Sequence, residues 1–203
     1  MKSLAILAGG KSTRMGTDKA FLKIDKATFL QRIFTDACYC FDKIYISVDT
    51  KEHAKKIMQD IPQANIIIDK YKEIGPIGAI ATILEETEIE KIAVVPTDVP
   101  EAALDILALM IDECDKKACA LKLSDKIEPL LAVYTKEVLP LIKEGISKKE
   151  YSIFKVLKNE YRIFTKADLM KKYPYLKQVD FKKAFRNINF PGDYKDFIKE
   201  KND

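Results

Sequence analysis

The chain has 203 residues, of which 47% are hydrophobic and 33% charged, the balance expected of one globular domain with an apolar core. The formal net charge is only +4 and the lysines are spread along the whole chain, which argues against nucleic acid as a partner. The apolar run at the N-terminus is too short for a signal peptide or a membrane span. We therefore expect a cytoplasmic monomer that binds neither nucleic acid nor a membrane.

The cysteines and the single histidine do not have the spacing of a zinc site. Cys38 and Cys40 are separated by one residue, and Cys114 and Cys119 by four. We expect all four cysteines to be buried, reduced thiols. His53 falls on a predicted surface helix, which disfavours a Ser–His or Cys–His nucleophile.

Short apolar runs alternate with helical patterns along the first two thirds of the chain. Strands are predicted at residues 3–7, 43–48, 65–69, 91–95 and 118–123. Helices are predicted at residues 28–41, 51–59, 77–86 and 102–114. This alternation predicts a three-layer α/β/α sandwich around a mostly parallel, doubly wound (Rossmann-like) sheet.

The pattern is less regular in the last third. Strands are predicted at 128–134 and 161–165, and helices at 136–144 and 152–158. In the final segment, 187–199, a strand end is expected to enter a last helix with Pro191 in its first turn. No repeat or Pro/Gly/Ser-rich linker interrupts the sequence, so residues 1–203 are expected to form a single domain.

The segment LAGGKSTRMGTDK directly follows the first predicted strand. Its adjacent glycines, Gly9 and Gly10, allow the backbone to approach a ligand and to turn N–H groups toward phosphate oxygens. Arg14 and Lys19 add positive charge for a polyphosphate. The spacing is that of neither G-x-x-x-x-G-K-[ST] nor G-x-G-x-x-G, so those two classes are disfavoured. The alternative is a flexible basic surface loop.

Two further groups follow predicted strands, where ligands bind in sheets of this class. Asp98, in VPTDVP after the fourth strand, is placed to coordinate Mg²⁺ bridging phosphates, or else to cap a helix. Gly75 and Gly78 open the helix after the third strand. They either leave N–H donors free for an anion or serve the helix entry alone.

Polar residues also end two strands and the last extended segment. Asp69 ends the third strand, where it could accept hydrogen bonds from a base or ribose or cap the loop, and Ser47 ends the second in an equivalent place. Asn187 and Asn189, in NINFPGD, alternate along the chain and are therefore expected to point to the same face. They would donate to a phosphate or complete a metal shell, the alternative being a simple turn.

In this order the motifs LAGGKSTRMGTDK, GPIGA, TDVP, EPL and NINFPGD resemble the molybdenum cofactor guanylyltransferases, a family of the nucleotidyltransferase superfamily. The resemblance spans nearly the whole chain. It implies transfer of GMP from GTP to the terminal phosphate of Mo-molybdopterin, with release of pyrophosphate and with Mg²⁺ as the cofactor. It also implies that residues 1–124 bind the nucleotide and 125–203 the acceptor, and it allows molybdopterin-delivery proteins or recipient molybdoenzymes as partners.

Carried over by position, the resemblance also implies the residues of the site. GTP is expected to contact Leu7, Ala8, Gly9, Gly10, Lys19, Ser47, Asp69 and Asp98. Asp98 is also the expected Mg²⁺ ligand, and it acts in catalysis together with Arg14 and Lys19. The molybdopterin side is expected to include Arg14, Gly75, Gly78, Asn187 and Asn189.

Alternatives remain open within and outside this class. Ser47 stands where the family commonly has asparagine, so a cytidylyltransferase acting on the same cofactor is an alternative. A sugar- or polyol-phosphate nucleotidyltransferase and a non-catalytic GTP-binding delivery protein are two others.

Overall fold

A seven-stranded sheet forms the centre of the protein. The computed structural model describes residues 1–10 and 18–202. Within these residues the strands lie in the order β5-β4-β1-β6-β8-β7-β9. Their bounds are β1 Ser3–Leu7, β4 Lys43–Val48, β5 Asn65–Ile68, β6 Lys91–Pro96, β7 Ala118–Leu123, β8 Lys126–Thr135 and β9 Tyr161–Phe164. Strand β8 runs antiparallel to β6 and β7, and the other neighbouring strands of this sheet are parallel, which confirms the mostly parallel sheet.

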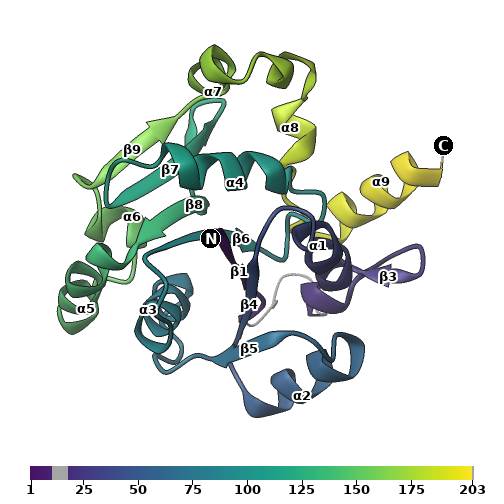
Figure 1. Cartoon of the computed structure of the whole chain (residues 1–203). Coiled ribbons are helices and arrows are strands. Elements are labelled where there is room, and N and C mark those ends of the chain that lie inside the picture. Colours follow the sequence, from purple (N-terminus) through teal and green to yellow (C-terminus); the bar gives the residue numbers. More distant parts are fainter. Residues whose placement is uncertain (11–17, 203) are drawn as a thin grey trace.

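Helices cover both faces of the sheet. In β1, Leu4 and Ile6 join one hydrophobic cluster while Ala5 and Leu7 join another, because successive side chains of a strand point to opposite faces. The first cluster includes side chains of α1 Phe29–Ala37, α2 Lys51–Asp60 and α4 Leu104–Glu113. The second includes side chains of α3 Pro76–Glu86, α5 Leu139–Ser147 and α6 Ile153–Val156. Figure 1 shows α3 and α5 on one side of β1 and α1 on the other, which confirms the three-layer architecture.

Local sequence signals explain where several elements begin and turn. Thr28 caps α1, and its side chain and that of Gln31 form a reciprocal capping box. Two short strands before it, β2 Lys23–Ile24 and β3 Ala27–Thr28, form a hairpin that the periodicity did not predict. Asp25 lies in its turn with φ 53°, a left-handed conformation that aspartate tolerates better than most residues. β7 and β8 are joined by an equally tight turn, in which Ser124 has the same φ.

The C-terminal third contains short helical elements that the sequence pattern did not resolve. They are the 3₁₀ turn η3 Pro174–Gln178 and the helices α7 Lys166–Lys172 and α8 Phe181–Ala184. The helix predicted at 136–144 is present as the 3₁₀ turn η2 Lys136–Val138 followed by α5. The last helix, α9 Pro191–Asn202, begins at the predicted proline. The strand end expected before it is not formed. Instead, the N–H of Ile188, a buried residue, donates to the carbonyl oxygen of Asp98 at 2.7 Å, which fastens this segment beside the end of β6.

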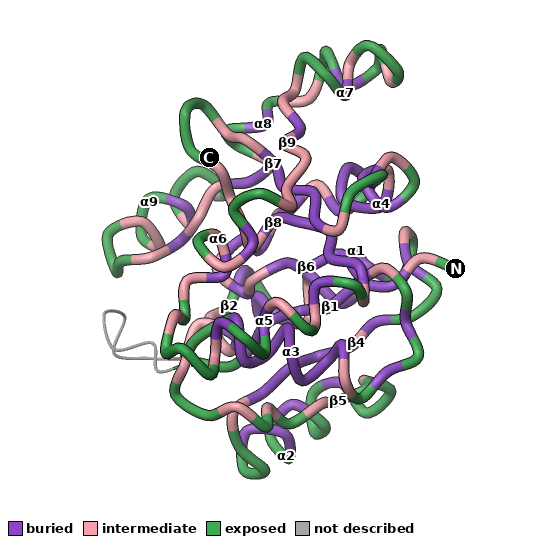
Figure 2. The backbone as a smooth tube through the Cα atoms, turned by 90° about the vertical axis from the view of Figure 1, so that its left-hand side faces the viewer, coloured by how far each residue is buried: buried purple, intermediate pink, exposed green. Residues whose placement is uncertain are grey.

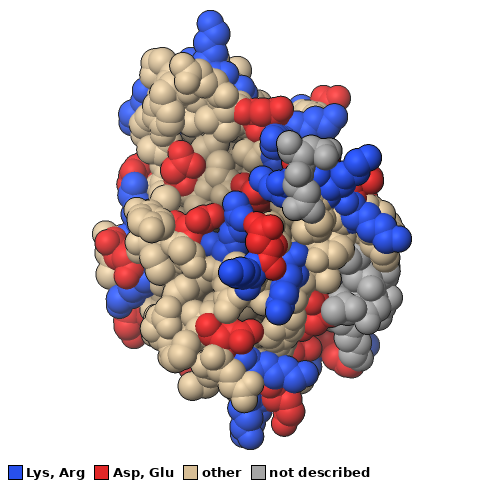
Figure 3. Space-filling view, turned by 90° about the vertical axis from the view of Figure 1, so that its right-hand side faces the viewer, with Lys and Arg blue, Asp and Glu red and all other residues tan. Residues whose placement is uncertain are grey.

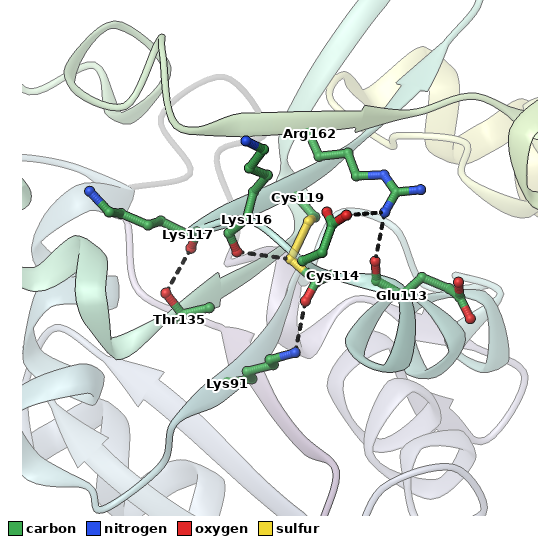
Figure 4. The surroundings of a disulfide bond; sticks show 9 residues. Lys91, Glu113, Cys114, Lys116, Lys117, Cys119, Thr135 and Arg162 are labelled. Atoms are coloured by element: carbon green, nitrogen blue, oxygen red, sulfur yellow. Dashed lines mark hydrogen bonds and ion pairs between the residues drawn. A yellow bond between two sulfur atoms is a disulfide. The ribbon is translucent and has the colours of Figure 1, made fainter.

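The cysteines differ from the expectation of four buried thiols. Cys114 and Cys119 form a disulfide with a Cα–Cα distance of 5.8 Å, because the chain turns back from α4 directly into β7 (Figure 4). Around the disulfide, Lys91 donates to the carbonyl oxygen of Cys114, and Arg162 to that of Glu113. Cys38 is exposed and Cys40 is partly buried, and both are free thiols.

The surface and the interior divide as in a globular protein. Buried segments run through β1, β6 and α3, and exposed ones lie mainly in the connections and outer helix faces (Figure 2). On the face shown in Figure 3, basic and acidic side chains are interspersed. Of the helices in the described ranges 1–10 and 18–202, none is long and apolar enough to cross a membrane.

Candidate active site

An open cavity of about 860 Å³ lies at the carboxyl ends of β1, β4, β5 and β6. From β1 the chain continues to β4 on one side, and β6 lies on the other side of β1. This reversal of strand order places the cavity at the topological switch point, where ligands bind in sheets of this class. Its lining includes many of the residues singled out from the sequence: Leu7, Ala8, Gly9, Gly10, Lys19, Asp69, Gly75 and Asp98.

The glycine pair after β1 forms one wall of the cavity. Gly10 has φ 130°, a conformation that residues with a side chain rarely adopt. A Cβ on Gly9 would lie 3.3 Å from Oδ2 of Asp69, so the missing side chain permits the close approach of these two segments. Arg14, predicted to act in the same segment, lies outside the described residues.

Lys19 joins three predicted motifs at one end of the cavity. Its Nζ donates to Oδ2 of Asp98 at 3.1 Å and to Oδ1 of Asn189 at 2.7 Å. The side chains of Lys19 and Asp98 are 16% and 23% exposed, so the ion pair is shielded without being closed to a ligand. LAGGKSTRMGTDK, TDVP and NINFPGD therefore meet at a single ammonium group.

Asp98 does not cap a helix. Helix α4 begins after Ala103, which makes no side-chain capping bond, and the Asp98 carboxylate faces Lys19 instead. Asp193, in the first turn of α9, holds the chain that precedes this helix. Its Oδ2 accepts from the N–H groups of Asn189 and Phe190, both at 2.9 Å, and so fixes the segment that carries Asn189.

Asp69 lies at another wall of the cavity, just after β5. The hydroxyl of Ser47 donates to its Oδ1. Burial raises the pKa of the Asp69 carboxyl from 3.8 to about 6, although the Ser47 hydrogen bond and the charge of Lys72 both act to lower it. Ser47 itself is fully buried and does not line the cavity, so its side chain acts on the cavity through Asp69.

The two glycines at the start of α3 differ in their surroundings. Gly75 lines the cavity with φ 77°, and Pro76 follows as the first residue of the helix. Gly78 is buried away from the cavity, where a Cβ would lie only 2.5 Å from the carbonyl oxygen of Tyr71. It therefore permits α3 to pack against the loop that follows β5.

Asn187 and Asn189 do not line one cavity together. Asn189 contacts Lys19, whereas Asn187 lines a second cavity of about 430 Å³. Lysines 122, 166 and 182 also line that second cavity. The expectation that both asparagines share one face assumed an extended strand, and the backbone at these positions is irregular.

Sequence reasoning missed several residues of the cavity lining, charged ones among them, and misplaced His53. Asp18, Asp49 and Lys72 line the cavity. Asp49 could have been found, because it directly follows the correctly predicted β4. His53 is on α2 as expected, but the residue is buried rather than at the surface, and it contacts both Asp18 and Asp49.

A parallel sheet whose switch point carries a glycine pair and a lysine–carboxylate pair defines a nucleotide-binding α/β protein. The family model for the MobA-like NTP transferase domain matches residues 4–163, and the chain belongs to this family. It is a nucleotidyltransferase, as the motifs predicted.

Curated relatives and a solved structure agree with this assignment. The chain is 30% identical to a probable molybdenum cofactor guanylyltransferase of Clostridium perfringens strain 13, with 98% of each chain covered. It is 29% identical to the molybdenum cofactor guanylyltransferase of Syntrophotalea carbinolica, over 77% of this chain and 74% of the relative. Its fold matches the crystal structure of molybdopterin-guanine dinucleotide biosynthesis protein A from Archaeoglobus fulgidus, with a TM-score of 0.81, 21% identity and 98% of each chain covered. The resemblance drawn from the motifs is thereby confirmed.

Proposed function

We propose that the protein transfers GMP from GTP to the terminal phosphate of Mo-molybdopterin and releases pyrophosphate. The observation that carries this proposal is the contact of Lys19 with both Asp98 and Asn189, because it unites the phosphate-loop motif with the C-terminal motif. The names of the curated relatives supply the substrates. In the proposed reaction an oxygen of the acceptor phosphate bonds to the α-phosphorus of GTP, and the bond to the β-phosphate oxygen breaks.

The reaction needs no protein nucleophile, since the acceptor oxygen is already ionised. The protein has to align the two substrates and offset the charge that develops on the leaving pyrophosphate. The N–H groups around Gly9 and Gly10 are suited to the phosphates. Lys19 is placed to exchange its contact with Asp98 for a phosphate oxygen, and Arg14 would add a second positive charge. Mo-molybdopterin, the acceptor, is proposed to bind at the cavity wall that Gly75 forms.

The residues present fit the expected Mg²⁺. Asp98 and Asn189 offer a carboxylate and an amide oxygen on either side of Lys19 Nζ, and oxygen ligands are those that Mg²⁺ prefers. Over the described parts of the chain, no group of three or more His, Cys, Asp or Glu residues could hold a metal by itself. That donor set suits an ion bound by one carboxylate together with substrate phosphates. When bound, Mg²⁺ would withdraw charge from the phosphate oxygens.

Asp69 is the proposed residue for reading the nucleoside. Its carboxylate lines the cavity and accepts a hydrogen bond from Ser47 at Oδ1, while Oδ2 faces Gly9. Guanine presents two neighbouring N–H donor groups on its Watson–Crick edge, which match one carboxylate. Cytosine presents one such group beside an acceptor, so an ionised Asp69 favours GTP over CTP.

The decisive experiment supplies the purified protein with GTP, Mg²⁺ and Mo-molybdopterin and measures pyrophosphate and the dinucleotide product. Formation of both in equal amounts is expected, and CTP should give a much lower rate. Pyrophosphate release with CTP but not with GTP, in the presence of Mo-molybdopterin, would show that the protein is a cytidylyltransferase. Pyrophosphate release with a sugar phosphate but not with Mo-molybdopterin would refute Mo-molybdopterin as the acceptor.

Binding provides a simpler preliminary test. In calorimetric titrations with Mg²⁺, GTP should bind at least about tenfold more tightly than CTP, a difference of about 1.4 kcal/mol. Equal affinities would contradict the assignment of Asp69 to the base.

A further inference from the structure

His53, the only histidine of the chain, is buried beside the cavity without lining it. It lies in the first turn of α2, where its backbone N–H donates to the side chain of Thr50, the N-cap. A buried, polar ring in a helix that otherwise packs on an apolar core requires polar partners. Those partners come from two separate segments of the cavity wall.

The two ring nitrogens face two carboxylates. Nδ1 lies in a hydrogen bond of 3.2 Å with Oδ1 of Asp49, which follows β4. Nε2 lies 3.1 Å from Oδ2 of Asp18, within ion-pair distance but not aligned as a hydrogen bond. Both carboxylates line the cavity. A neutral imidazole can donate to one of them and an imidazolium to both.

Asp18 connects this pair of contacts to Lys19. Its Oδ1 accepts from the N–H of Ala20 at 3.0 Å, so Asp18 is the N-cap of η1 Lys19–Phe21. At the other end of η1, the ring of Phe21 packs against the His53 ring with centroids 5.6 Å apart. His53 therefore touches the turn that carries Lys19 on both sides of that lysine.

We propose that His53 is a positioning residue that fixes the Lys19 turn to the nucleotide cavity through Asp18, Phe21 and Asp49. The lysine is then oriented from two directions, by η1 at its backbone and by Asp98 at its ammonium group. A long lysine side chain loses less entropy on binding phosphate when its backbone is already fixed. The part of this inference that concerns nucleotide binding rests on the proposed function.

The first test needs no nucleotide. Amide hydrogen exchange is measured for Ala20, Phe21 and Leu22, whose N–H groups are bonded within or beside η1. His53→Leu should speed their exchange by about tenfold or more relative to the amides of the central sheet. Ile57→Ala is the matched control, because Ile57 is fully buried one turn further along the same helix and does not line the cavity.

The second test measures the affinity for GTP with Mg²⁺. His53→Leu should weaken binding by about tenfold, while His53→Gln, which keeps a polar N–H group between Asp18 and Asp49, should recover most of it. Asp18→Asn should weaken binding too, and the double variant should be no weaker than the worse single one, because both changes break one connection. Ile57→Ala should lower the melting temperature and leave the affinity within about twofold of the original.

These outcomes separate the inference from the proposed function. Unchanged exchange at η1 in His53→Leu would overturn the inference, as would independent, multiplying effects of the His53→Leu and Asp18→Asn variants. If His53→Leu does not fold, exchange in His53→Ala, which removes the same ring contacts, decides. A wild-type protein that binds neither GTP nor CTP would overturn the proposed function, and the exchange result would still decide the positioning of η1.

Discussion

Replacing Asp69 with asparagine should stabilise the fold at neutral pH and weaken nucleotide binding. The pKa of this carboxyl is raised from 3.8 to about 6, chiefly by burial. A carboxyl of this kind binds its proton more tightly in the folded than in the unfolded chain. Its contribution to stability is therefore present at low pH and is lost as the pH rises through about 6.

The size of the effect follows from the same pKa. The change from 3.8 to about 6 corresponds to about 3 kcal/mol. Because the carboxyl borders an open cavity, solvent screens part of that cost, and we expect about 2 kcal/mol. Asp69→Asn removes the ionisation, so the difference in free energy of unfolding between variant and wild type should shift in the variant's favour as the pH rises. About half of the ~2 kcal/mol develops below pH 4.5, where the unfolded chain already ionises, so about 1 kcal/mol is expected from about pH 4.5 to about pH 8.

Urea unfolding of both proteins at the two pH values measures this shift. Comparing the difference at two pH values cancels the constant effect of exchanging an acid for an amide. Ser47→Ala is the matched variant: its hydroxyl donates to Asp69 and acts to lower the pKa, so its removal should enlarge the loss of stability with pH. A difference between wild type and Asp69→Asn that does not depend on pH would refute the reasoning. In titrations with GTP, Asp69→Asn should bind at least about tenfold more weakly, because its amide replaces one acceptor with a donor.

Three other variants test separate features of the structure. Asp98→Asn should lower turnover by about a hundredfold or more with little change in melting temperature, and a near-normal rate measured by pyrophosphate release would remove Asp98 from the reaction. Gly78→Ala should lower the free energy of unfolding by about 1–3 kcal/mol in urea, because its Cβ would lie 2.5 Å from the Tyr71 carbonyl oxygen; an equally stable variant would show that α3 can shift. Cys114→Ser with Cys119→Ser should cost about 2 kcal/mol of stability, the chain entropy of so short a loop, and should not alter GTP affinity, since neither cysteine lines the cavity.

The sequence was sufficient for the central layers of the fold. Strands β1, β4 and β7 have the bounds that their continuous apolar runs predict, because a strand covered on both faces leaves a strong signal. The helices between them were found to within a few residues. The hairpin of β2 and β3 and the short helices after β9 were missed, because they are short and, unlike the central strands, are not continuous apolar runs.

The site could be predicted only in part, for a related reason. Residues that follow strand ends, such as Asp69 and Asp98, were found because the sheet dictates where strand ends meet. The interaction of Lys19 with Asn189 spans 170 residues and depends on how Asp193 and Ile188 fix the last segment, which no local pattern encodes. The burial of His53 escaped prediction likewise, because its partner Asp18 lies on a short turn that periodicity does not reveal.

Among the described residues that line the cavity, the acidic ones outnumber the basic ones, and the contacts of the acidic residues indicate how this negative charge is offset. The described lining contains two lysines, Lys19 and Lys72, and more carboxylates than cations: Asp18, Asp49, Asp69, Glu73 and Asp98. A triphosphate would be repelled by such a lining unless each carboxylate were engaged elsewhere or bridged by a cation. Asp18 and Asp49 are engaged by His53, Asp69 accepts a hydrogen bond from Ser47, and Asp98 is paired with Lys19. In the proposed reaction Lys19 would turn to phosphate, and Asp98 would then hold the expected Mg²⁺, whose charge would offset the acidic lining. On this proposal the lysine and the metal ion would have complementary functions at Asp98, whose partner Lys19 is the residue at which the three motifs converge.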